Sequence, residues 1–133
     1  MHHSIDYIPH LFRGRVTKVV SHYQVRAEVD LGLDITIVRT FRLANITPPD
    51  MRMATGAHAA IAMDHMLNEL LQEGTDVLLV TYPDPREKDA YEAAIWVSDP
   101  DNQLKPFKNI ETTLIEAGHC CWTDATRELP TLE

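Results

Sequence analysis

Seven histidines and two neighbouring cysteines are the residues of this sequence that most directly suggest metal binding or nucleophilic chemistry. On a helix, His58 and His65 would be separated by about two turns, or roughly 10 Å, which is too far for both to bind one zinc ion without ligands from elsewhere. We therefore interpret both as surface residues. Cys120 and Cys121 follow His119, but no second Cys or His pair stands at ligand spacing. We interpret the two thiols as structural and buried or partly buried.

The hydrophobic pattern predicts the elements that must position any site. Alternating or β-rich runs predict strands over residues 15–20, 24–31, 34–43, 77–82 and 91–97. Helical spacing predicts helices over residues 55–73 and 107–117. Thr55 would cap the first helix and Gly74 would stop it. Its apolar stripe comprises Ala59, Met63, Met66, Leu67, Leu70 and Leu71. The order of elements matches an α+β fold, a five-stranded Greek-key barrel with packed helices, although alternation alone fits a generic α+β sandwich equally well.

The composition bounds the class of protein. The chain has 133 residues, 44% of them hydrophobic and 24% charged, which is typical of one globular domain. It has no apolar run of about 18 residues, no signal-peptide core near its N-terminus and no disulfide framework. We therefore expect a soluble, cytoplasmic protein without membrane contact. The formal charge of −8 disfavours general coating of nucleic acid but leaves a local basic site open.

Short segments that keep their order and spacing carry a family resemblance. They are Val19–Val25 with Glu28–Gly32, Phe41–Asp50, Met66–Leu71, Ala93–Val97 and Leu114–His119. Together they resemble the staphylococcal nuclease (thermonuclease) family, in which Val-Asp-Gly-Asp-Thr precedes the second strand and Arg-Leu-Ala-Gly-Ile-Asp-Thr-Pro-Glu matches the second segment. The resemblance implies an OB-fold barrel with two to three packed helices. It divides the chain into an N-terminal extension (1–12), a nuclease-like domain (13–122) and a loosely ordered tail (123–133).

The resemblance also implies where chemistry would reside. In the family, carboxylates hold calcium, one acid handles the attacking water, and two arginines stabilise the developing charge. The two metal-binding aspartates correspond here to Tyr23 and Thr47. The glutamate corresponds to Asp50, the first arginine to Arg42, and the second falls at or near Ala90. We therefore expect no intact catalytic site, no metal site and no cofactor, with calcium binding lost because both ligating aspartates are replaced.

Several residues keep two interpretations. Arg86 and Lys88 lie near Ala90, so a shifted register would return one positive charge to the site. Arg42 is either a remnant phosphate binder or an outward-facing strand residue. Tyr23 either stacks on a base or a partner's side chain, or fills the space that the ion would occupy, and we favour filling. Met51 and Met53 are candidates for an adaptable contact surface.

Three functions compete at this point. The leading hypothesis is a catalytically inactive nuclease-like domain that binds a protein partner, because the net charge is acidic; Tyr23, Arg42, Thr47 and Asp50 are its binding candidates. The first alternative is a divergent metal-dependent nuclease that uses Asp50 with Asp30, Glu28 or main-chain oxygens. The second is a single-stranded nucleic-acid-binding module that uses Arg42, Arg15, Lys18 and Tyr23. The hairpin also resembles phage versions of the family, which would imply a host-directed role.

Overall fold

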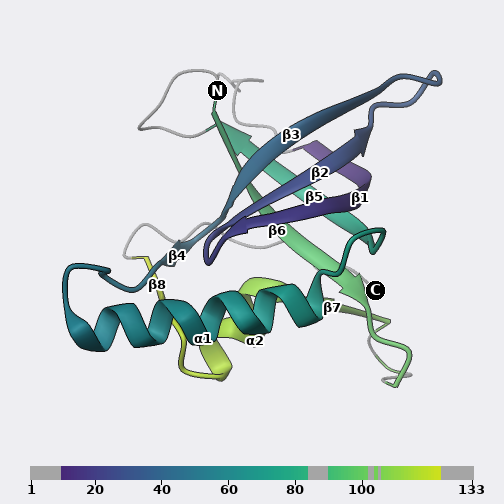
Figure 1. Ribbon diagram of the computed structural model, residues 1–133. Coiled ribbons are helices and arrows are strands. Elements are labelled where there is room, and N and C mark those ends of the chain that lie inside the picture. Colours follow the sequence, from purple (N-terminus) through teal and green to yellow (C-terminus); the bar gives the residue numbers. More distant parts are fainter. Residues whose placement is uncertain (1–9, 84–89, 102–103, 105, 124–133) are drawn as a thin grey trace, which may run out of the picture.

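The computed structural model describes residues 10–83, 90–101, 104 and 106–123, and Figure 1 shows how their elements are arranged. The strands are β1 (His10–Ser21), β2 (Gln24–Asp30), β3 (Thr36–Leu43), β4 (Ile46–Thr47), β5 (Asp76–Pro83), β6 (Tyr91–Ser98), β7 (Phe107–Asn109) and β8 (Cys121–Trp122). The helices are α1 (Ala54–Leu70) and α2 (Ile110–Glu116). Arg86, Lys88 and nearly all of the expected tail lie outside the described residues.

Five of the strands close into a mixed barrel, which confirms an α+β fold and is consistent with an OB-like architecture. β1 pairs antiparallel with both β2 and β5, β2 pairs with β3, and β5 pairs with β6. A short parallel pairing between β3 and β6, over Phe41–Leu43 and Tyr91–Ala93, completes the circle. β7 extends the sheet beyond β6, while β4 and β8 form a separate two-stranded sheet.

The barrel core forms because apolar residues alternate along each strand. In β2 the inward side chains Val25, Ala27 and Val29 are almost fully buried, whereas the residues between them are exposed. In Figure 1, α1 crosses one end of the barrel and α2 lies beside it. Met63 and Leu67 of α1 join the same buried cluster as the strands, which confirms them as core residues. The helices therefore cover one end of the barrel.

Helix α1 differs from expectation at both ends. Its N-cap is Met53 rather than Thr55, and no side chain caps it. Instead the Asp50 carbonyl accepts a hydrogen bond from the Met53 N–H at 3.3 Å. The helix ends at Leu70, before Gly74, whose positive φ of 87° suits a turn and whose N–H donates to the Val16 carbonyl at 2.8 Å.

Two other boundaries need correction. β1 starts at His10 rather than Arg15, because antiparallel pairing with β5 extends over His10–Arg15. The strand thus includes the last three residues of the expected extension. The predicted helix over 107–117 is wrong in its first three residues, which form β7 against β6. Asn109 then caps α2, since its Oδ1 accepts a hydrogen bond from the Thr112 N–H at 2.9 Å.

Candidate functional site

The tight turn between β1 and β2 positions Tyr23. Within it the Ser21 hydroxyl donates to Gln24 Oε1 at 3.1 Å and accepts from the Tyr23 N–H at 3.4 Å. The Leu43 N–H donates to the Tyr23 carbonyl at 2.9 Å, which ties the turn to the end of β3. The half-buried Tyr23 side chain packs against the barrel core. Hydrogen bonds therefore fix the Tyr23 backbone on two sides, and packing against the core fixes its ring.

Arg42 lies over this ring. Because Phe41 and Leu43 point into the core, the strand period turns the half-buried Arg42 to the outer face. Its guanidinium carbon lies 5.0 Å from the Tyr23 ring centroid, which is a cation–π distance. The His22 ring packs edge-on to Tyr23, with centroids 4.9 Å apart. Partial burial lowers the pKa of His22, although the Asp64 carboxylate on α1 opposes this shift.

Glu92 is a residue of this region that the sequence did not reveal. Arg42 and Glu92 are register partners in the parallel pairing of β3 and β6, so their side chains leave the same face of the sheet. Glu92 is buried, at 8% exposure. The sequence did contain a signal for it: Glu92 is the single acid inside the apolar run Tyr91–Val97. An acid in a buried strand needs a partner for its carboxylate. The arginine therefore has a buried carboxylate at its own level on the neighbouring strand.

The other two candidates, Thr47 and Asp50, are exposed and have contacts of their own. Thr47 is exposed in β4, where it pairs with Cys121. Asp50 is exposed and bound by Arg52, whose Nε and Nη2 donate to its two carboxylate oxygens, both at 3.1 Å. The Arg52 side chain, with help from its backbone N–H, lowers the pKa of Asp50. Asp50 is therefore already paired with a neighbour in sequence.

The basic groove considered for nucleic acid is not assembled as expected. Arg15 forms an ion pair with Asp76 at 3.3 Å and lines a hollow of about 230 Å³ with Glu28 and Asp30. Arg15 pairs with Glu28 of β2, and Arg42 pairs with Gln24 of the same strand. These two partners are four residues apart, which is roughly 13 Å along a strand. Arg15 thus faces acidic groups rather than Arg42. The same arrangement places Glu28 and Asp30 beside arginines, which makes them poor additions to an Asp50 metal site.

The histidine and cysteine candidates lie apart from this site. His58 and His65 are exposed on α1, as surface residues. Among the residues that the structure describes, no group of three or more His, Cys, Asp or Glu is placed to hold a metal ion. Both thiols are free, and Cys121 is exposed, which corrects the expectation that it is at least partly buried. Cys120 is half-buried, and its burial raises the thiol pKa to about 12.

A fully buried acid, Glu111, was also missed. It lies in the first turn of α2 with 1% exposure, and its two carboxyl oxygens lie 3.0 and 3.2 Å from the Ile95 N–H that it accepts from. Burial raises its pKa to about 8, against the opposing effect of hydrogen bonds from backbone groups and Asn109. The available signal was that Glu111 stands three residues before Leu114, on the buried side of the helix. Its role is to join α2 to β6 in the core.

Taken together, the site offers an aromatic ring and a cation rather than a cluster of carboxylates. A phenol and a guanidinium do not suit a hard divalent ion, which prefers several carboxylate oxygens, but they can contact a planar or anionic group. Comparisons with protein-family models and with curated proteins found no match, so the family resemblance rests on the sequence segments alone. No helix within the described ranges is both long and apolar enough to span a membrane.

Proposed function

We propose that this chain is a catalytically inactive, staphylococcal nuclease-like domain of the Greek-key OB type that binds a protein partner. The observation that supports the loss of catalysis is the contact between Tyr23 and Arg42. A ring takes the position where the family resemblance implies a calcium ligand. The remaining acid, Asp50, is neutralised by Arg52. The charge stabilisation that a metal would supply to phosphodiester cleavage is thereby missing.

A protein partner is favoured over nucleic acid by charge and surface. The formal charge of −8 repels a polyanion at long range. Large apolar side chains are exposed on the β2–β3 hairpin, and exposed apolar patches mark sites of protein association. We also propose a cytoplasmic location, which the two free cysteines support.

A cleavage assay tests the catalytic part of this proposal. Single-stranded DNA and RNA would be incubated with the protein in calcium, magnesium or manganese, and compared with a chelator control. We expect no cleavage above the control with any of the three ions. Cleavage that calcium raises and a chelator abolishes would replace the proposal with a divergent nuclease.

Single-stranded nucleic-acid binding is the second candidate, favoured by the contact of His22, Tyr23 and Arg42 on one surface. Aromatic rings and arginine stack on bases without sequence preference. Fluorescence anisotropy with labelled oligonucleotides at low salt would detect it. Binding that Tyr23→Ala abolishes would favour this candidate over a protein partner.

A further inference from the structure

Within the ranges that the structure describes, the first half of β3 has a strand neighbour on one side only. Thr36–Thr40 pairs with Arg26–Asp30 of β2. On the other side, the parallel pairing with β6 begins at Phe41 and ends at Leu43. Among the described residues, no strand lies along the second edge of Thr36–Thr40. Alternate residues of an edge strand present their N–H and C=O groups outward, and such an edge is a template for another extended chain.

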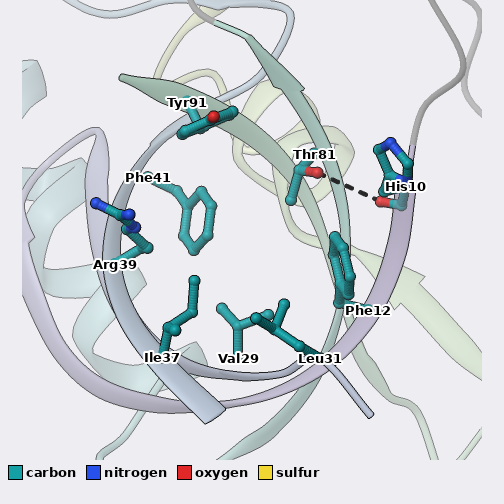
Figure 2. A pocket seen from close by; sticks show the side chains of 9 residues that line it. All are labelled: His10, Phe12, Val29, Leu31, Ile37, Arg39, Phe41, Thr81 and Tyr91. Carbon is teal, nitrogen blue, oxygen red and sulfur yellow. Dashed lines mark hydrogen bonds between the residues drawn. The ribbon is translucent and has the colours of Figure 1, made fainter. Parts of the chain in front are cut away.

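A pocket opens beside this edge, at the end of the barrel away from the helices (Figure 2). It has a volume of about 240 Å³, enough for one large side chain. Ile37, Arg39 and Phe41 of β3 line it, and because they alternate along the strand their side chains leave the same face. In Figure 2, Phe12 faces them from the other side of the opening, and Tyr91 lies at its top, next to Phe41. The pocket wall is therefore mainly aromatic and aliphatic.

The hairpin next to the pocket exposes apolar side chains in an unusual backbone setting. Leu33, at its tip, is 94% exposed, and Ile35 and Val38 are about half exposed. Leu33 also has a positive φ of 55°, a conformation that a leucine adopts only at a cost. A strained and fully exposed leucine does not stabilise the free domain. Leu33 and Ile35 enlarge the apolar surface that begins in the pocket, whereas Val38 faces the opposite side of the strand.

The charges around the edge indicate the chemistry of the occupant. Arg39 lies on the rim of the pocket and is exposed, so it can pair with a carboxylate. Asp34 in the adjoining turn, together with the formal charge of −8, disfavours a chain of phosphates. An extended peptide needs only one anionic side chain to match this pattern. Five residues of edge span roughly 17 Å, the length of about five residues of added strand.

We propose that the edge Thr36–Thr40 and the adjoining pocket bind an extended segment of a partner protein by strand addition. An apolar side chain of the segment enters the pocket, and an acidic side chain pairs with Arg39. Main-chain hydrogen bonds supply affinity and the pocket supplies specificity in this mode of recognition. This inference rests on the proposed protein-binding function and assigns its surface.

Selection from a displayed library of random peptides provides the probe, and a synthetic version of a selected peptide is then measured by calorimetry. We expect an apolar and an acidic residue at alternate positions of the selected peptides. Arg39→Glu should weaken binding at least tenfold. Arg26→Glu is the matched control, because it makes the same charge change on the opposite face of the same hairpin; it should change binding less than twofold.

Backbone methylation distinguishes strand addition from side-chain docking. Two versions of the peptide carry N-methyl groups at alternate residues, one at the odd and one at the even positions. One version should lose binding, because its N–H groups face β3, and the other should retain it. Equal binding by both, or equal effects of Arg39→Glu and Arg26→Glu, would overturn the proposal.

Other occupants of the edge give different results, each of which contradicts the proposal. Selected peptides that match residues 1–9 would assign the edge to this chain's own N-terminal segment. A wild-type dimer that Arg39→Glu dissociates would assign it to a second copy.

If Tyr23→Ala abolishes peptide binding and the edge variants do not, the protein-binding function stands and only its surface is wrong. Metal-dependent cleavage would instead overturn the proposed function without affecting the peptide result.

Discussion

The guanidinium carbon of Arg42 lies 5.0 Å from the centroid of the Tyr23 ring, where the β1–β2 turn meets the end of β3. The two residues are far apart in sequence and are brought together because Gln24 and Arg42 are register partners. Tyr23 also packs on the barrel core, so one ring fills space beneath and partners a cation above. The ring therefore fills space in the free domain, while stacking on a base or a partner's side chain stays a prediction.

Tyr23→Ala should lower the free energy of unfolding by about 2 kcal/mol or more, because it removes both core packing and the cation–π contact. Tyr23→Phe is the matched control, since it keeps the ring, and should stay within about 0.5 kcal/mol of wild type. Urea denaturation followed by fluorescence measures both. Equal and small effects of the two substitutions would show that the ring does not stabilise the turn.

Restoring the acids that the family resemblance implies should return calcium binding, and more strongly when Asp50 is also released. Tyr23→Asp with Thr47→Asp adds two carboxylates, but Arg52 still occupies both oxygens of Asp50. Adding Arg52→Ala should raise calcium affinity further, as measured by calorimetry. Wild type is the control and should gain little thermal stability from about 10 mM calcium.

Nuclease activity in that triple variant should stay weak, because no arginine stands at Ala90, and one such group contributes a factor of about 100 to 1,000. Calcium affinity in the triple variant that does not exceed wild type would mean that Tyr23 and Thr47 are not the corresponding positions.

Gly56→Ala should destabilise the domain although alanine is the better helix former by about 1 kcal/mol. A Cβ at position 56 would lie 1.8 Å from the Asp50 carbonyl oxygen, a contact that requires the backbone before α1 to move. Thermal unfolding should therefore show a lower Tm for the alanine variant. A raised Tm would place the loop that carries Asp50 away from the first turn of α1.

Stability should fall as the pH rises, because of Glu111. Its folded pKa is about 8, above its ordinary value of 4.5, so the folded state keeps a proton that the unfolded state releases between these values. The free energy of unfolding should therefore drop from about pH 4.5 to about pH 8, by an amount on the order of 5 kcal/mol, and then level off. Urea unfolding at a series of pH values measures it.

Glu111→Gln keeps an uncharged acceptor for the Ile95 N–H and should remove most of this pH dependence. Glu116→Gln, an exposed position on the same helix, should leave it intact. If Glu111→Gln and Glu116→Gln show the same slope with pH, another group controls it.

The sequence predicted the parts of the fold that depend on local period. The alternation of Val25, Ala27 and Val29 and the helical stripe through Met63 and Leu67 each reflect one buried face, and both were confirmed. The closed barrel also agrees with the predicted order of elements.

The sequence could not predict features that depend on contacts between distant segments. Phe107–Asn109 has helix-compatible spacing, but its hydrogen bonds go to β6. The pocket at the barrel mouth combines residues from five strands, and only the closure of the sheet brings them together.

The tip of the β2–β3 hairpin offers the last test, because it separates stability from binding. Leu33 holds a positive φ of 55° at 94% exposure, and asparagine tolerates this conformation better than leucine. Leu33→Asn should therefore raise the free energy of unfolding by a few tenths to about 1 kcal/mol. The same change should weaken the selected peptide several-fold, because it removes apolar surface beside the edge of β3. Ile61→Asn, which removes an exposed apolar side chain from α1, should leave peptide binding unchanged. A Leu33→Asn variant that binds as tightly as wild type would show that the hairpin tip takes no part in recognition.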